Sequence, residues 1–390
     1  MSAPRVAFVT NLCPYYRRPL YQLLAERMET TFFFFSEGHE AYLSSEMQHE
    51  PGNLPIREVR RMTIAGNPLL IGLERELRRD RYDVVVKCLN GRLMVPHVYH
   101  LARRRGIPFV LWTGMWHHPQ TLAHRLTRPL AEGVYRGADA IVAYGDHVKR
   151  FVESVRGVVP GKTYVAGQAI NAARFSAVEP AFGDPAEVLF VGQLEEHKGI
   201  DDLMSAFAAV DAPAARLRIA GTGSLRDRVL ARAQRDPRIE VLGHVANAGM
   251  PVEIARARCL VLPAVTTSRF REAWGLVVNE AMATGVPVIG TDAVGAAAGG
   301  LLVDGRNGMV VPERRPDALA AALDTLITDP ELARTLGAQG RSDVAAFSYD
   351  RMARAFGSAI EHAMAARPAK AVAVQQRLDT SRPPSRDAAR

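Results

Sequence analysis

Residues 271–292 read REAWGLVVNEAMATGVPVIGTD, a stretch that contains a complete helix-to-strand unit. Gly285 ends the predicted helix, since glycine is common just past a helix terminus, and a short apolar run at 286–289 follows at once. Two glutamates, Glu272 and Glu280, stand eight residues apart around a Trp-Gly pair. Such a unit is typical of an α/β protein.

The two glutamates do not fit on one continuous helix as a joint site. Positions eight apart would lie roughly 12 Å from each other along the helix axis, and glycine three residues after Glu272 is unfavourable inside a helix. We therefore expect Glu272 on the loop before the helix and Glu280 within it. Gly275 and Leu276 would then lie at the helix start, where free N–H groups suit an anionic phosphate. An ordinary amphipathic helix with two solvated carboxylates has the same spacing.

Strand-like runs divide the chain into two halves. They are short, rich in β-branched or aromatic residues and separated by helical patterns, which predicts βαβ units with parallel sheets. The runs lie at 6–9, 32–35, 84–87, 109–112, 141–144 and 163–166, and again at 188–191, 217–220, 239–242, 260–262, 286–289 and 309–311. Between them, EPAFGDPAE at 179–187 marks a boundary. We predict domains at 1–178 and 179–348, a helix at 349–365 that crosses back to the first domain and a disordered basic tail at 366–390.

Glycine-containing loops follow three strands of the second half. VGQLEEHKG places Gly192 after a strand and Lys198 before the next helix, where an ammonium group suits a diphosphate. AGTGS places Gly221 and Gly223 after another strand, and His244 follows a third. Each loop also has an ordinary reading as a tight crossover, because such turns need glycine for backbone reasons.

The string from Glu272 to Ile289 resembles the donor-site signature E-x-W/F-G-L-V-x-x-E-A-M-A-x-G-x-P-V-I of the retaining glycosyltransferases of group 1. The Gly192 to Gly199 loop is similar to the diphosphate signature of the same family, G-R-L-x-x-x-K-G. Two departures are visible. Ala273 stands where the family usually has proline, and Gln193 stands where it has arginine.

The resemblance implies the GT-B fold, with two Rossmann-like domains facing a cleft, and retaining transfer of a sugar from a nucleotide-diphosphate donor to an acceptor hydroxyl. Glu272 and His117 are the implied catalytic residues, and Arg17 and His118 are the implied acceptor-binding residues. An ordinary structural loop around the two histidines remains an alternative. The implied donor-binding residues are Gly192, Lys198, Gly221, Gly223, His244, Gly275, Leu276, Glu280 and Gly295. The family usually requires no metal ion or other cofactor, and the sequence has no D-x-D pair at a strand end.

Composition and charge limit the class of protein and the partners that it can have. The chain has 390 residues, with 48% hydrophobic and 23% charged, which suits two ordinary globular domains. Its three cysteines lack any paired spacing, which argues against a disulfide framework or a zinc site. Residues 1–175 hold 24 Lys and Arg against 15 Asp and Glu, net +9, without a nucleic-acid motif. We expect a cytoplasmic protein without a transmembrane segment. Its basic first domain favours the inner face of an anionic membrane or a lipid-linked substrate over nucleic acid, and scattered solvated arginines are an alternative explanation of each basic cluster.

Three functional classes remain open from the sequence. We favour a glycosyltransferase that acts on a carbohydrate or lipid-linked acceptor in bacterial surface-polysaccharide or lipid-linked glycan assembly. A sugar-nucleotide epimerase shares this architecture but would work without an acceptor. A catalytically silent membrane-associated protein would keep the fold and lose affinity for the donor, and the presence of Glu272, Glu280 and Lys198 disfavours it.

Overall fold

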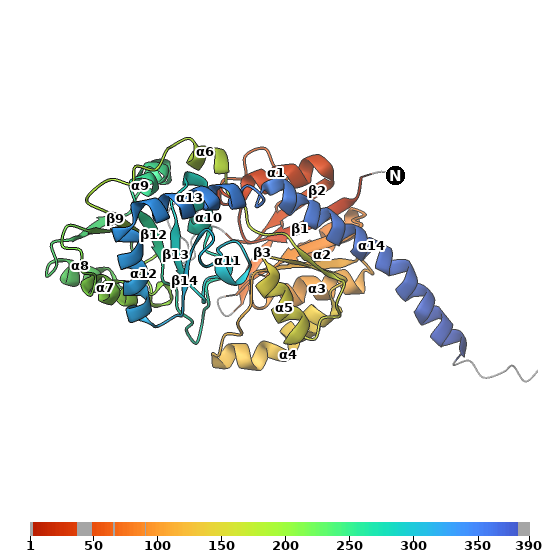
Figure 1. Ribbon diagram of the computed structural model, residues 1–390. Coiled ribbons are helices and arrows are strands. Elements are labelled where there is room, and N and C mark those ends of the chain that lie inside the picture. Colours follow the sequence, from red (N-terminus) through yellow and green to blue (C-terminus); the bar gives the residue numbers. More distant parts are fainter. Residues whose placement is uncertain (1–2, 37–48, 65–66, 90, 381–390) are drawn as a thin grey trace, which may run out of the picture.

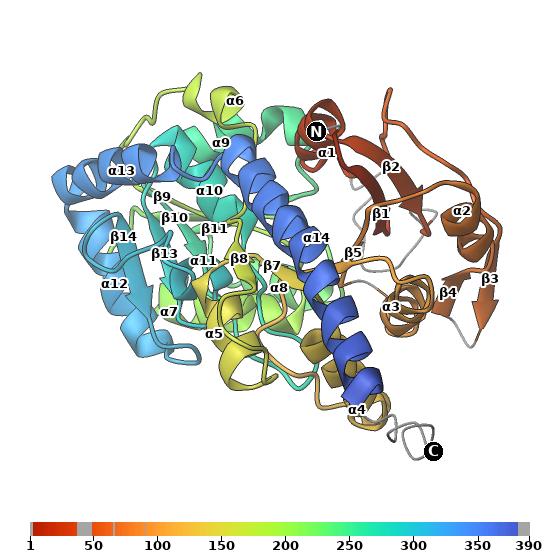
Figure 2. The same cartoon turned by 90° about the vertical axis from the view of Figure 1, so that its right-hand side faces the viewer.

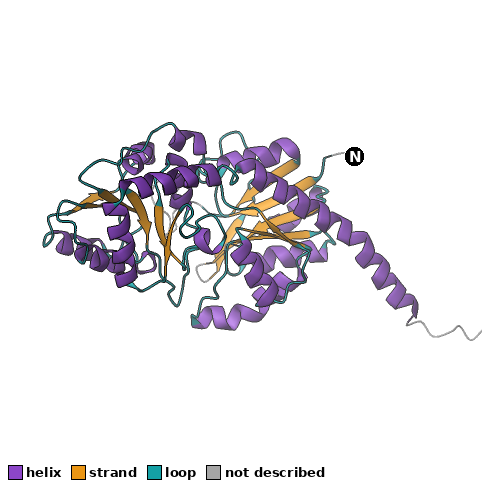
Figure 3. Cartoon of the chain, viewed as in Figure 1, coloured by secondary structure: helices purple, strands orange, loops and turns teal. Residues whose placement is uncertain are grey.

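Each half of the chain folds around a six-stranded parallel sheet with helices on both faces (Figures 1 and 3). The computed structural model describes residues 3–36, 49–64, 67–89 and 91–380. The twelve predicted strands are all present. The strand expected at 286–289 begins two residues later, at Val288, because Pro287 has no N–H group to donate to the ladder.

The first sheet has the order β2-β1-β5-β6-β7-β8. Its strands are β1 (Arg5–Thr10), β2 (Glu29–Phe34), β5 (Val84–Cys88), β6 (Phe109–Thr113), β7 (Ala140–Ala143) and β8 (Thr163–Val165). The covering helices are α1 (Arg18–Arg27), α2 (Leu73–Arg79), α3 (Met94–Arg104), α4 (Leu122–Gly137) and α5 (Asp146–Ser154). A short antiparallel hairpin, which the sequence analysis missed, is formed by β3 (Arg61–Ile64) and β4 (Asn67–Leu70).

The second sheet has the order β11-β10-β9-β12-β13-β14. Its strands are β9 (Glu187–Val191), β10 (Arg216–Ala220), β11 (Ile239–Gly243), β12 (Cys259–Leu262), β13 (Val288–Thr291) and β14 (Gly308–Val311). Its helices are α7 (Ile200–Ala208), α8 (Arg226–Ala233), α9 (Met250–Ala255), α10 (Leu276–Thr284), α11 (Gly295–Ala298), α12 (Pro316–Thr328) and α13 (Pro330–Val344), with short 3-10 turns η1 (Glu196–Lys198) and η2 (Asn247–Gly249). Successive strands are added on one side of β9 as far as β11 and on its other side from β12 onward. Ligands of such parallel sheets bind at this switch in strand order, beyond the carboxyl ends of the strands.

Alternation along the strands explains why both faces of each sheet are buried. In β1, Ala7 and Val9 belong to one apolar cluster, while Val6 and Phe8 belong to the cluster on the other face. The strands therefore appear in the sequence as nearly continuous apolar runs.

Two connections depart from the predicted boundaries. Helix α6 (Ala172–Ser176) precedes the predicted boundary, yet Ile170 and Phe175 pack in the core of the second domain. The last helix, α14 (Tyr349–Thr380), covers the first sheet through Phe356 and Ile360 and runs obliquely across that domain (Figure 2). It continues to Thr380, so residues 366–380 are helical where a disordered tail was expected. The rest of that tail lies outside the described residues.

Candidate active site

The loops after β9, β10 and β11 meet at one edge of the second sheet. The Gly192 N–H donates to the Ala220 carbonyl at 3.0 Å, and the Gly221 N–H donates to the Gly243 carbonyl at 2.7 Å. A Cβ atom on Gly221 would lie 1.8 Å from the Gly192 carbonyl oxygen, and one on Gly223 would lie 2.5 Å from a backbone oxygen of the same loop. These two predicted donor-binding glycines are therefore required by packing between the loops.

Gly192 differs from its neighbours because a Cβ atom there would have room. Its nearest contact would be a Phe190 ring carbon at 3.5 Å, an ordinary van der Waals distance. The nearest other group is the Lys198 side chain at 3.9 Å. The space beside Gly192 thus adjoins the predicted diphosphate-binding lysine.

Lys198 and Glu272 form an ion pair that joins η1 to the loop before α10. Glu272 is buried, with 7% of its surface exposed. Burial raises the pKa of the Glu272 carboxyl, but the Lys198 ammonium, helped by His197 and the Trp274 backbone N–H, outweighs burial and holds the pKa below its usual value. Glu272 is therefore a buried carboxylate that stays ionised.

The first domain holds the same loop through its backbone. The Trp116 indole N–H donates to the Glu272 carbonyl at 2.9 Å, and the Arg271 guanidinium stacks 3.7 Å from the centroid of the Trp116 ring. A Cβ atom on Gly295 would lie 2.1 Å from the Ala273 carbonyl oxygen, so only glycine lets this loop pack closely against the start of α11. The position of Glu272 thus depends on both domains.

Glu280 lies within α10, as expected, and lines a cavity between the domains of about 710 Å³. Gly275 begins the helix with φ near +89°, a conformation that favours glycine. Burial raises the pKa of Glu280 to about 7, and Arg174 opposes the rise. The other lining residues come from both domains and include Tyr15, Tyr16, Arg18, Asn171, Arg174, Ala246, Asn247 and Tyr349.

A second interdomain cavity, of about 170 Å³, borders the Glu272 loop. It is lined by His117 and Trp116 of the first domain and by Arg271 and Ala273 of the second. Burial and the nearby Arg271 lower the pKa of His117, so its ring is neutral near pH 7. The Nε2 atom of His117 has no hydrogen-bond partner within the described residues.

Two predicted acceptor-binding residues, Arg17 and His118, line neither cavity. His118 accepts a hydrogen bond at its Nδ1 from Arg156, at 2.8 Å, within the first domain. Arg17 is only 8% exposed, and its guanidinium lies against the rings of Trp112 and Tyr144. Each side chain is held by partners of its own domain, and the partners of Arg17, Trp112 and Tyr144, line the smaller cavity in its place.

His244 is exposed on the loop after β11 and also lines neither cavity. The next residues of that loop, Ala246 to Ala248, do line the larger one. The structure thus places this loop at the larger cavity through Ala246–Ala248 rather than through His244.

His147 is a positioning residue that the sequence analysis missed. It is buried at the start of α5, and burial lowers the pKa of its imidazole to about 4. The neutral ring lies with Nε2 3.1 Å from the Ala273 carbonyl, so Nε2 carries the proton and donates it. A second missed contact is the buried Asn279 amide, which accepts from the Trp274 indole at 2.7 Å. The sequence signal that could have identified His147 is its position just after β7, at the carboxyl end of a parallel strand.

Two family profiles match most of the chain. The profile described as Glycosyltransferase Family 4 matches residues 20–174, and the one described as Glycosyl transferases group 1 matches residues 185–329. The chain belongs to the group 1 glycosyltransferases. The gap between the two matches contains the connection from α6 to β9.

Individual relatives are more distant. Glycogen synthase of Mycobacterium tuberculosis is 30% identical over 206 residues, which cover 51% of this chain and 48% of that protein. Alpha-D-kanosaminyltransferase of Streptomyces kanamyceticus is 29% identical over 258 residues, which cover 60% of this chain and 65% of that protein. The matched part thus spans about half to two thirds of these relatives.

Solved structures share the whole fold. Sucrose-phosphate synthase of Thermosynechococcus elongatus superposes with a TM-score of 0.74 at 19% identity, covering 93% of this chain and all of that one. An Anabaena protein solved in complex with UDP superposes with a TM-score of 0.71 at 16% identity, covering 92% and 99%. The predicted GT-B fold is confirmed. Among the described residues, no helix is long and apolar enough to cross a bilayer.

Proposed function

We propose that this protein transfers a sugar from a nucleotide-diphosphate donor to an acceptor hydroxyl with retention of configuration. The observation that carries the proposal is the buried, ionised Glu272, which Lys198 pairs from one loop and Trp116 holds from the other domain. The residues on either side of it, Arg271 and Ala273, line the smaller interdomain cavity. The similarity to an Anabaena protein solved with UDP supports a nucleotide donor.

In this proposal, the donor lies across the carboxyl edge of the second sheet. Glu280 accepts hydrogen bonds from the ribose in the larger cavity. Lys198, the open space beside Gly192 and the start of α10 receive the diphosphate. Since Gln193 supplies no positive charge, Lys198 is the cation nearest to Gly192 on this loop.

The donor sugar and the acceptor meet beside the Glu272 loop. As the diphosphate leaves, positive charge develops on the sugar ring, and a carboxylate that stays ionised stabilises that charge. Lys198 and the helix start neutralise the negative charge on the leaving group. His117 supplies an unpaired Nε2 in the smaller cavity for a sugar hydroxyl. No metal ion or other cofactor takes part in this scheme.

We place the reaction in bacterial surface-polysaccharide or lipid-linked glycan assembly. The net charge of +9 on residues 1–175 supports a substrate or surface that is anionic. An exopolysaccharide phosphotransferase of Streptomyces coelicolor is among the relatives, at 28% identity over 286 residues.

The decisive experiment is incubation with a panel of nucleotide sugars, with and without simple glycoside acceptors. We expect nucleoside diphosphate release from one donor, and NMR of the product should show the anomeric configuration of that donor. Conversion of the donor sugar without an acceptor would indicate an epimerase instead. Absence of nucleotide binding by calorimetry would refute the proposal. A catalytically silent membrane-associated protein would then be the remaining alternative.

A further inference from the structure

Helix α4 of the first domain presents an apolar stripe to solvent. Leu122, Leu126 and Leu130 recur at every fourth position and are 71%, 72% and 56% exposed. The opposite side attaches the helix to its domain through the buried Tyr135, whose hydroxyl lies 3.0 Å from Thr113 Oγ1. Large leucines at this spacing on an outer face need a partner that the described part of the chain does not provide.

A neighbouring loop extends the stripe. Val155 and Val159 follow α5 and are 52% and 67% exposed. Arg156 ties this loop to α4 through Glu132, at 3.7 Å, and Lys162 donates to two carbonyl groups at the end of α4. We call the three leucines and two valines the α4 surface.

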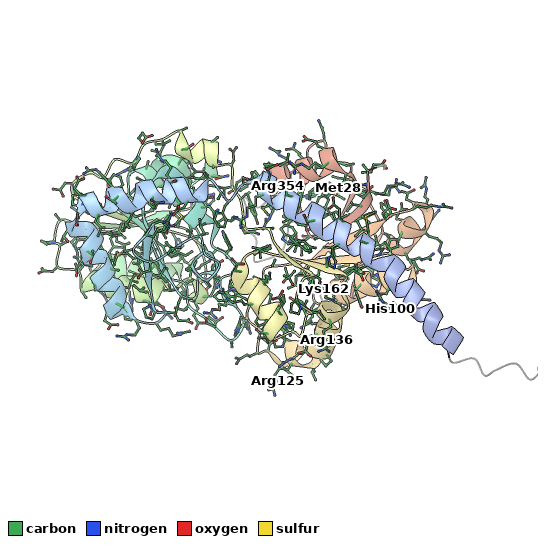
Figure 4. All side chains as sticks on the ribbon, turned by 45° about the vertical axis from the view of Figure 1, so that its right-hand side comes forward. Met28, His100, Arg125, Arg136, Lys162 and Arg354 are labelled. Carbon is green, nitrogen blue, oxygen red and sulfur yellow. The ribbon has the colours of Figure 1, made fainter. Side chains whose placement is uncertain are left out.

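The charges around the leucines of the α4 surface are mostly positive, whereas Glu153 lies near its two valines. Residues 114–131 contain no acidic residue, and α4 carries Arg125, Arg128 and Arg136. Its single acid, Glu132, is only 20% exposed and accepts a hydrogen bond from Arg128 at 2.6 Å. Figure 4 labels Arg125 and Arg136 on this helix, at the outer edge of the first domain. The apolar stripe is therefore flanked by guanidinium groups.

We propose that the α4 surface docks on the anionic surface of a lipid bilayer. A helix with an apolar stripe and arginines beside it lies in the plane of the interface, where the leucines enter the acyl boundary and the arginines reach lipid phosphates. A second copy of the chain is a poorer occupant, since a two-fold contact through α4 would bring like charges together.

This docking places the bilayer next to the smaller cavity. His117 and Pro119 line that cavity, and α4 begins three residues after Pro119. The intervening Gln120 N–H donates to the Ser268 carbonyl of the second domain at 2.7 Å, which fixes the start of α4 at the cleft. On the proposed function, an acceptor anchored in the membrane would enter the cleft from this side.

The test is flotation of the purified full chain with vesicles of phosphatidylcholine alone or with about 30% phosphatidylglycerol. We expect binding to the anionic vesicles only, and weaker binding in about 0.5 M salt. The triple variant L122Q/L126Q/L130Q should bind at least about tenfold less. The variant I71Q/V252Q/V303Q, which changes three other exposed apolar residues, should bind like wild type.

Equal binding by wild type and the leucine variant would overturn the proposal, as would absence of wild-type binding. A wild-type dimer that the leucine variant abolishes would assign the surface to a second copy. Nucleotide binding without vesicles should be the same in wild type and the leucine variant. If neither wild type nor the leucine variant binds a nucleotide, the proposed function is refuted and the vesicle result is unaffected.

Discussion

Replacing Glu280 with glutamine should stabilise the fold in a way that depends on pH. Below pH 4.5 the carboxyl holds its proton in the folded and unfolded states. Between pH 4.5 and about 7 the unfolded state releases the proton while the folded state keeps it, so stability falls as pH rises. Above about pH 7 the carboxyl is ionised in both states, and the cost of a carboxylate in this half-buried position remains. Glutamine has the same shape and no proton to lose.

The rise in the pKa of Glu280 from 4.5 to about 7 corresponds to about 3 kcal/mol, because one pKa unit is about 1.4 kcal/mol. We therefore expect the free energy of unfolding of Glu280→Gln, relative to wild type, to increase by up to about 3 kcal/mol between pH 4.5 and pH 8. Any effect of the substitution that is unrelated to the proton adds a constant and does not change this slope.

Urea denaturation at several pH values measures the difference, with Glu361→Gln on the exposed side of α14 as a matched control. Calorimetry with UDP at pH 8 completes the test, since the same variant should bind the nucleotide less tightly if Glu280 accepts from the ribose. A stability difference that stays constant with pH would refute the reasoning from burial. A pH-dependent difference with unchanged UDP binding would refute only the assignment to ribose.

Four further substitutions test the site. Glu272→Gln should reduce turnover by about 100-fold or more while UDP binding stays within about threefold, as measured by steady-state kinetics and calorimetry; equal turnover would remove Glu272 from the chemistry. Gly221→Ala should destabilise the second domain by about 2 kcal/mol or more in urea unfolding, whereas Gly192→Ala should fold normally and bind UDP less tightly. His147→Phe should lower kcat without changing UDP affinity, because the variant loses the N–H donor that positions the Ala273 carbonyl. Wild type should lose stability as the pH falls from 6.5 to 4, because only its unfolded state can protonate the imidazole freely; the variant has no imidazole and should lose less. Urea unfolding at both pH values would contradict this account if the two proteins lost the same stability.

The strands could be predicted because burial on both faces leaves nearly continuous apolar runs in the sequence. The positions of Glu272 and Glu280 relative to α10 also followed from local geometry, since glycine and helix length limit where each can lie. The hairpin of β3 and β4 has four residues in each strand, which is too short for a clear alternating pattern.

Side-chain direction on the loops could not be predicted. Arg17 and His118 follow strands at the cleft edge, but each found a partner within its own domain, Tyr144 and Arg156 respectively. His147 shows the opposite error, because its role depends on a carbonyl group 126 residues away in the sequence. Such contacts arise from the packing of two domains, and local sequence contains no signal for them.

The return of α14 to the first domain has a consequence for synthesis on the ribosome. Phe8 and Trp112 of the first domain pack against Phe356 of α14, a helix that is made after all the strands of both sheets. The second sheet, β9 to β14, and the helices α7 to α13 form a contiguous part of the chain that can fold before α14 has been made. The first domain is made earlier and leaves the part of its apolar face that α14 covers exposed until that helix has been made. Nascent chains stalled before Tyr349 should therefore depend on chaperones that bind apolar surfaces.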